Sequence, residues 1–303
     1  MPRRSAIRKT PRKRARGSRR RGWRLKRVWP GARLRRRWFR AFRRAPGGVQ
    51  LFAALGIAAG LFLTVNWIYQ VVEKPTELFF PISGTLYKSP SETWRDYGPL
   101  FERYSTAIIS PQFLAALAQV EGSGDPIVRT YWRLSLKPHP FEIYRPASSA
   151  VGMYQLTNGT FAEARRLCIH DHRVIEQGPW NDWHSCWFNS LYMRILPSDA
   201  IEMTSAYLDR AVTETLLAHH VRDATLQQKQ NLAAVIHLCG AGAGDLYVRR
   251  GLELARGQMC GDHVASVYVG RVNAMKRLFV RLAGAGRPPA QRPQQTAASQ
   301  EGR

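Results

Sequence analysis

The sequence predicts an all-α protein in which a helical domain follows one membrane-spanning helix and a basic N-terminal tail. Three observations indicate this class. Residues 1–44 hold 21 of the 46 Arg and Lys residues and no Asp or Glu, in a chain of 303 residues with a net charge of +25. An apolar segment without any charge follows. In the remainder, apolar residues recur with the period of a helix and not with the alternation of a strand.

The N-terminal tail, residues 1–46, is expected to be disordered, because like charges repel and little apolar surface can be buried. The rest of the chain holds 25 basic against 21 acidic side chains, so it is only slightly basic. This distribution excludes a uniformly basic nucleic-acid coat, a collagen-like repeat and a fully disordered chain. We therefore expect no nucleic-acid partner.

Residues 47–72 are predicted to form a single transmembrane helix. The stretch Val49–Val72 has no charged residue, and about 20 residues suffice to cross the hydrocarbon core. Trp67 and Tyr69 lie where an interfacial aromatic belt is expected. A buried core helix is the alternative. The positive-inside rule places the basic tail in the cytoplasm, against anionic lipid, and everything after Glu73 outside the bacterial inner membrane, in the periplasm.

The chain after this helix divides into a linker, a domain and a tail. Residues 73–91 contain three prolines and are expected to be a linker. Residues 92–284 are expected to form the helical domain. Residues 285–303, rich in Pro, Gln, Ala and Gly, are expected to be disordered.

Helix boundaries in the domain can be predicted from capping residues. Ser110 with Pro111 begins one helix, and Gly122 and Gly124 end it. The other helices are expected from the capping pair Thr160/Glu163 to about Leu167, from Ser198 towards His220, from the capping pair Thr225/Gln228 to the glycines Gly240, Gly242 and Gly244, and over Asp245–Arg256 and His263–Leu282. One short hairpin is expected near residues 129–146.

Glu121 is the first candidate for a catalytic residue. It lies on the last turn of an apolar helix, with Leu114, Leu117 and Ala118 on the same side. An apolar wall favours a protonated carboxyl, which a general acid needs. The alternative is a surface glutamate, but there it would face the negative end of the helix dipole.

Four motifs in order resemble the lytic transglycosylase SLT domain, whose fold is similar to goose-type lysozyme. They are AQVEGSGDP (118–126), SSAVGMYQLTNGTF (148–161), LAAVIHLCGAGAG (232–244) and VYVGRV (267–272). The resemblance covers roughly residues 105–280. Three features depart from the family pattern: Gly122 stands where the family usually has Ser, Cys239-Gly240 stands in place of Tyr-Asn, and residues 165–205 form an insertion.

The resemblance implies cleavage of the β-1,4 bond between N-acetylmuramic acid and N-acetylglucosamine in peptidoglycan. Glu121 would protonate the leaving oxygen and then, as a carboxylate, deprotonate the muramyl 6-hydroxyl, which closes a 1,6-anhydro ring. The substrate's acetamido group would stabilise the anomeric centre. One carboxyl thus acts as acid and then as base, and no metal or cofactor is implied.

The resemblance also implies a set of residues that bind or support the substrate. Met153, Tyr154 and Gln155 would line the sugar cleft, and Tyr268 would orient the carboxylate of Glu121. Ser148 and Ser149 would support the loop near Glu121. Simple alternatives remain open: core packing for the Met and the two Tyr residues, and turn or capping chemistry for the two Ser residues.

The four cysteines all follow the predicted membrane helix, in an oxidising compartment, which favours disulfides. Chain order favours Cys168–Cys186 and Cys239–Cys260 among three possible pairings. A zinc site formed by Cys168, Cys186 and nearby histidines is the alternative, but no typical ligand spacing supports it.

The predicted function is therefore that of a membrane-anchored lytic transglycosylase acting on peptidoglycan glycan strands. A hydrolytic lysozyme-like or chitin-cleaving glycosidase is one alternative, and a non-catalytic wall-binding scaffold is another. The physiological role stays open between wall remodelling, recycling and opening the wall for cell-envelope machinery.

Overall fold

The computed structural model describes residues 40–74, 77–78, 85–135, 144–178 and 185–285. The predictions of disorder for most of the N-terminal tail and for the C-terminal tail lie outside these residues. The chain divides into two compact units, residues 1–61 and 62–303.

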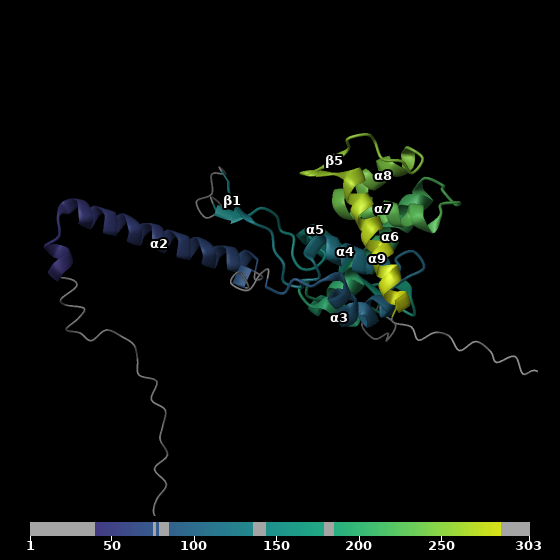
Figure 1. Cartoon of the computed structure of the whole chain (residues 1–303), viewed down its shortest axis with the longest axis horizontal. Helices are drawn as coiled ribbons and strands as arrows, with labels where there is room; N and C mark the ends of the chain where they lie inside the picture. Colours follow the sequence, from purple (N-terminus) through teal and green to yellow (C-terminus); the bar gives the residue numbers. More distant parts are fainter. Residues whose placement is uncertain (1–39, 75–76, 79–84, 136–143, 179–184, 286–303) are drawn as a thin grey trace, which may run out of the picture. The chain divides into compact units, whose positions relative to one another are not determined.

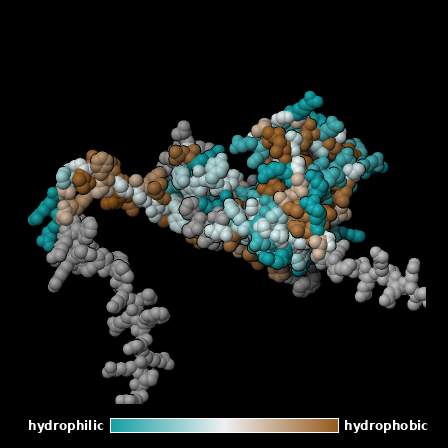
Figure 2. Space-filling view, in the orientation of Figure 1, coloured by the Kyte–Doolittle hydropathy of each residue, from teal (hydrophilic) through white to brown (hydrophobic). Residues whose placement is uncertain are grey.

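Helix α2, Gly47–Glu73, is the predicted apolar helix, extended by one residue at its end. The most apolar 18-residue window within Gly47–Val72 has a mean hydropathy of 2.0, and none of this window is buried. Figure 2 shows hydrophobic residues along its surface. A core helix would be mostly buried, and this window is not. The helix is long and apolar enough to cross a membrane.

Seven further α-helices lie among the described residues of the domain, and they build one hydrophobic core. Helix α9 packs along α4 and contacts α3 and α7, while α6 packs against α7 and α8 (Figure 1). The helices are α3 (Pro90–Arg103), α4 (Pro111–Gly122), α5 (Asn158–Ala164), α6 (Pro197–Ala218), α7 (Leu226–Cys239), α8 (Ala241–Arg249) and α9 (Ala265–Ala285). The predicted all-α character of the domain is therefore confirmed.

Local capping explains where α4 and α7 begin. The Ser110 side chain accepts a hydrogen bond from the amide of Phe113, and Thr225 and Gln228 form a reciprocal capping box, both as predicted. Helix α4 ends at Ser123, whose φ of 49° is left-handed. These signals lie within four residues of the helix ends, so they can be read from the sequence.

Several predicted boundaries are wrong. Thr157, not Thr160, caps α5, and α5 ends at Ala164 because Leu167 already belongs to a strand. Helix α8 starts earlier than expected, since Gly240 breaks the chain with a φ of 82° and a new helix begins directly after it.

In the described part of the chain, three antiparallel strand pairs accompany the helices, and only the first was expected. They are β1 (Trp132–Leu134) with β2 (Tyr144–Pro146), β3 (Leu167–His170) with β4 (Arg173–Glu176), and β5 (Met259–Cys260) with β6 (His263–Val264). The turn between β3 and β4 has positive φ at Asp171 (48°) and His172 (61°). Tight hairpin turns usually place Asn-Gly or Asp-Gly there, so an Asp-His turn gives a weak signal.

Both predicted disulfides are confirmed. Cys168–Cys186 joins β3 to the residue before the short 3₁₀ helix η3 (Trp187–Leu191), and Cys239–Cys260 joins the end of α7 to β5. The zinc alternative thereby loses its thiolate ligands. Among the described residues, no group of three or more His, Cys, Asp or Glu side chains could hold a metal ion.

Candidate active site

Glu121 lies at the edge of the hydrophobic core, on the last turn of α4. Leu114, Leu117 and Ala118, which precede it on the same helix, are fully buried. The side chain of Glu121 is 16% exposed. The carboxyl group is therefore backed by an apolar wall on one side and reaches solvent on the other.

Tyr268, on α9, holds this carboxylate although 147 residues separate the two in the chain. Its hydroxyl donates a hydrogen bond to Oε1 of Glu121. Burial raises the pKa of Tyr268 well above its usual value, and the charge of Glu121 raises it further. The phenol therefore stays protonated and remains a donor. The structure thus brings together the two residues that the resemblance pairs.

His237 is the third residue of the group formed with Glu121 and Tyr268, and the sequence did not predict its role. It lies in the last turn of α7, and its Nε2 atom is 3.7 Å from Oε1 of Glu121. Its side chain is only 6% exposed. It is the one ionisable residue in the apolar run from Leu232 to Leu238, and that isolation was the available signal.

The two oxygens of the Glu121 carboxylate have different surroundings. Both Tyr268 and His237 approach Oε1. Within the described part of the chain, Oε2 accepts no hydrogen bond, and it is not among the enclosed atoms that lack a partner. Because Oε2 is accessible and has no partner among these residues, it is the atom that can exchange a proton with a ligand.

Gly122 allows the second motif to pass directly against the first. A Cβ atom at Gly122 would lie 2.9 Å from the Cα atom of Met153 and 3.0 Å from its carbonyl oxygen. Real Cβ contacts of this kind are avoided, so the Ser that the family usually has here would clash with this backbone. The departure at this position therefore has a steric reason.

The side chains of Met153 and Tyr154 belong to the core and not to a cleft. They are 1% and 0% exposed, and the Tyr154 hydroxyl donates to the carbonyl of Leu114 at 3.2 Å. The expectation that these side chains line a sugar cleft is thus corrected in favour of the packing alternative. The motif turns its apolar side chains inward because α4 lies directly behind it.

Gln155 holds its own loop. Its Nε2 atom donates to the carbonyls of Gly152 at 2.9 Å and Val128 at 3.3 Å. Its φ of 47° is left-handed, and these two bonds stabilise that unusual conformation. The amide therefore shapes the loop beside Gly122; contact with a sugar stays a prediction.

The two serines act within their own turn. Ser148 Oγ accepts from the amide of Ala150 at 3.0 Å, and Ser149 Oγ accepts from the amide of Asn158 at 3.1 Å. These are turn and capping contacts, as the simpler alternative expected. They stabilise the segment that leads to Met153, which packs on Gly122.

A hollow of about 210 Å³ adjoins the buried Tyr268. Its lining comes from β6 and the first turns of α9: Asp262, His263, Val264, Val267, Tyr268 and Arg271. A ligand bound there would contact the residue that holds Glu121. The hollow is therefore one candidate for a binding cleft in the described part of the domain.

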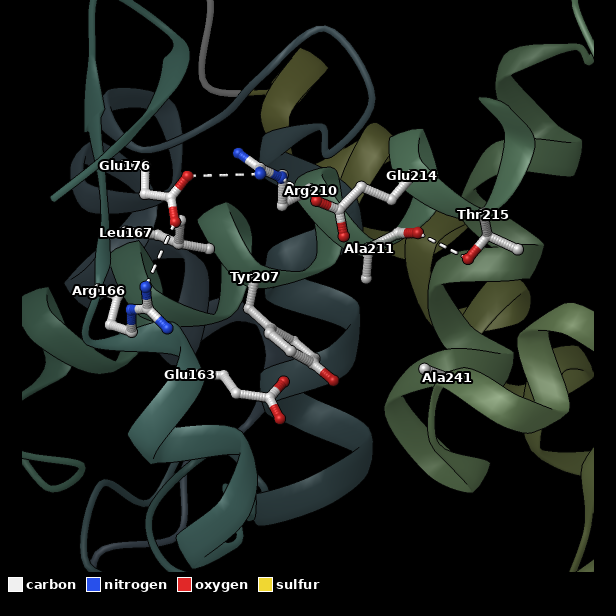
Figure 3. A pocket seen from close by; sticks show the side chains of 10 residues that line it. All are labelled: Glu163, Arg166, Leu167, Glu176, Tyr207, Arg210, Ala211, Glu214, Thr215 and Ala241. Atoms are coloured by element: carbon white, nitrogen blue, oxygen red, sulfur yellow. Dashed lines mark hydrogen bonds and ion pairs between the residues drawn. The ribbon is translucent and has the colours of Figure 1, made fainter. Parts of the chain in front are cut away.

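A second hollow, of about 230 Å³, is rich in carboxylates (Figure 3). Glu176 lies 3.6 Å from Arg166 and 3.4 Å from Arg210, and Arg210 also pairs with Glu214. These side chains are about half exposed, and arginine neutralises the two acids. Such an arrangement suits a solvated ion-pair surface better than acid catalysis.

Comparison of the chain with protein-family models, with curated proteins and with solved structures gives no match. The assignment of a function therefore depends on the residues and on their geometry.

Proposed function

We propose that the chain is a membrane-anchored lytic transglycosylase whose domain, residues 92–284, has a lysozyme-like SLT fold. The observation that carries the proposal is the hydrogen bond from the Tyr268 hydroxyl to the Glu121 carboxylate. Two motifs that the resemblance pairs are distant in the chain and adjacent in space. The resemblance predicts this contact between a residue on the last turn of α4 and a residue on α9, which no local feature of the sequence predicts.

The chemistry follows from the asymmetry of the carboxyl group. Tyr268 and His237 engage Oε1, which leaves Oε2 to protonate the glycosidic oxygen. Once ionised, the same group removes the proton of the muramyl 6-hydroxyl, and the 1,6-anhydro ring closes. The usual glycosidase needs a second carboxylate. The described partners of Glu121 are a phenol and an imidazole, which fits a scheme with one carboxyl group.

The proposed location is the inner membrane, with the N-terminus in the cytoplasm and the domain in the periplasm. The Arg-rich segment before α2 supports this orientation. Independent support comes from the two disulfides, which form in oxidising compartments. The proposed partners are peptidoglycan strands outside and anionic lipid at the basic tail, with cell-envelope machinery as a further partner.

Replacing Glu121 tests the proposal. The detergent-solubilised full chain is incubated with purified sacculi, and released muropeptides are counted for the wild type, Glu121→Gln and Glu163→Gln. Loss of the acid and base should reduce release by about 10²–10⁴-fold. Glu163 is an exposed carboxylate of the second hollow, so its variant should keep wild-type activity.

Unchanged release by Glu121→Gln would contradict the assignment. No release by the wild type would favour the non-catalytic scaffold. If only Glu163→Gln loses activity, the active site lies in the second hollow and not at Glu121.

A further inference from the structure

The outer end of α2 has a covered polar face. Asn66, Gln70 and Lys74 follow one another at four-residue intervals, which places them on one side of the helix. All three residues are at least 90% buried. Ile68 and Val72, between them, are 51% and 73% exposed. On one side of these two turns, apolar side chains are exposed. On the other side, the polar side chains are covered by another segment of the same chain.

The partner is the β1–β2 hairpin of the domain. The Asn66 side-chain amide donates to the carbonyl of Tyr144 at 2.8 Å. The Lys74 ammonium donates to the carbonyls of Ser148 at 3.2 Å and Ala150 at 3.0 Å. The hairpin strand β2 and the segment after it thus run along the last turns of α2.

A buried charge cluster fixes the base of this contact. The Glu77 side chain is completely buried; its carboxylate lies 3.1 Å from Lys74 Nζ and accepts hydrogen bonds from Arg129 and from the Trp132 indole. Burial lowers the pKa of Lys74, although Glu77 opposes this shift. Removing one partner of such a cluster leaves an uncompensated buried charge, so the cluster resists separation.

The depth of the contact follows from the length of α2. The apolar span of 26 residues measures about 39 Å at 1.5 Å per residue, against about 30 Å of hydrocarbon. The excess of about 9 Å is enough for its outer turns to reach the headgroup layer. Asn66 lies seven residues before the helix end at Glu73, about 10 Å along the axis. The hairpin strand bonded to Asn66 shares that depth.

The exposed side chains of the hairpin have the composition of a membrane interface. Leu134 is 75% exposed, Tyr131 67% and Tyr144 38%, and Leu134 and Tyr144, directly opposite in the register, share one face. Arg133 is also exposed, and as the neighbour of Leu134 in the strand it lies on the other face. Tyrosine and arginine beside an aliphatic residue are typical of the headgroup level, where rings and cations contact both lipid tails and phosphates.

We propose that the β1–β2 hairpin is a second membrane contact, with Tyr131, Leu134 and Tyr144 in the outer headgroup layer and Arg133 on lipid phosphates. The proposal rests on the membrane anchoring in the proposed function and not on its chemistry. The segment after β2 leads to Met153, which packs on Gly122. The contact would therefore hold Glu121 at a fixed height above the bilayer.

Spin labels on introduced cysteines test the proposal in the full chain, reconstituted in phosphatidylethanolamine/phosphatidylglycerol vesicles. The native cysteines form disulfides, so the introduced thiol is the labelled one. Leu134→Cys reports on the hairpin, Leu217→Cys on an exposed site of α6, and Leu55→Cys on α2. Leu134 and Leu217 are 75% and 67% exposed, so neither label disturbs the core.

The ratio of accessibility to oxygen over a water-soluble nickel chelate should be several-fold higher at residue 134 than at residue 217, and highest at residue 55. Equal ratios at 134 and 217, with a high ratio at 55, would overturn the hairpin contact and leave the anchoring intact. A low ratio at 55 would overturn the anchoring and the contact with it. A label at 134 shielded from both reagents would mean that protein covers the hairpin, which also overturns the contact.

Discussion

Two glutamates in the domain, the buried Glu202 and the partly exposed Glu121, each accept a hydrogen bond from a tyrosine, yet their surroundings differ. Glu202, on α6, uses both oxygens: Oε1 accepts from the amide of Ile169 at 2.9 Å and Oε2 from the Tyr192 hydroxyl at 2.7 Å. Glu121 receives Tyr268 and His237 on one oxygen. The first carboxylate is saturated by the protein, whereas the second has an oxygen left for a ligand.

The comparison teaches that a hollow does not identify a catalytic acid. Glu202 lines a hollow of about 240 Å³ together with Trp187 and Phe188, which resembles a sugar-binding surface. Its oxygens, however, hold β3 and the segment after η3 in place. The number of unused acceptor sites on the carboxylate separates a structural glutamate from a reactive one.

Among the variants that compare the two glutamate sites through their partners, the largest effect is expected from deleting each tyrosine hydroxyl in turn. Tyr268→Phe removes a bond to the reacting group, about 1.5–3 kcal/mol for a charged acceptor, and should lower kcat roughly 10–100-fold. Tyr192→Phe leaves an oxygen of buried Glu202 unsatisfied, so it should lower stability by about 1–3 kcal/mol. Muropeptide release and thermal unfolding, measured on both variants, check this.

The two variants act as controls for each other. Tyr268→Phe should lose rate with a nearly unchanged Tm, and Tyr192→Phe should lose Tm with a nearly unchanged rate at low temperature. The reverse pattern would exchange the roles that we give to Glu121 and Glu202.

A smaller effect is expected at His237. Its distance of 3.7 Å from Oε1 is longer than a direct hydrogen bond, so it contributes less than Tyr268. His237→Ala should lower kcat about fivefold with little change in KM, corresponding to about 1 kcal/mol. His237→Gln, which keeps a polar donor, should recover most of the rate. Equal losses in both variants, accompanied by a lower Tm, would mean that His237 only fills space.

The smallest effect concerns the pH dependence of stability. Burial raises the pKa of Glu202 above 4.5 in the folded protein, so the folded state binds the proton more tightly than the unfolded state. This tighter proton binding stabilises the folded protein fully below pH 4.5. The stabilisation is lost as the pH rises through the pKa of Glu202 in the folded state. Glu202→Gln should remove this decline, about a few degrees in Tm.

Thermal unfolding between pH 4 and pH 7 measures the effect, with Glu163→Gln as the exposed control. A Glu202→Gln variant whose Tm declines with pH as steeply as that of the wild type would show that Glu202 is not the group responsible.

The features that could be predicted from the sequence are those encoded locally. The starts of α4 and α7 depend on a capping side chain and the three residues after it. The existence of α2 follows from a run of residues without charge. The approach of Tyr268 to Glu121 was predicted only because motif order pairs them. Nothing in the residues around either one encodes their distance.

The missed features depend on contacts between distant segments. Met153 and Tyr154 belong to a motif that suggests a sugar cleft. Their side chains instead point into the core, because α4 packs behind the motif. Glu77 belongs to a proline-containing stretch expected to be a linker, and its burial arises from Arg129 and Trp132, more than 50 residues away. The sequence around it gives no sign of this cluster.

The most direct test of the central claim, that one carboxyl group both opens the glycosidic bond and closes the ring, is the mass of the products that the wild-type full chain releases from sacculi. We expect muropeptides with 1,6-anhydro-muramyl ends, because the 6-hydroxyl that Glu121 deprotonates is the nucleophile. Products with free reducing ends, 18 mass units heavier as water addition requires, would contradict this account and support the hydrolytic alternative.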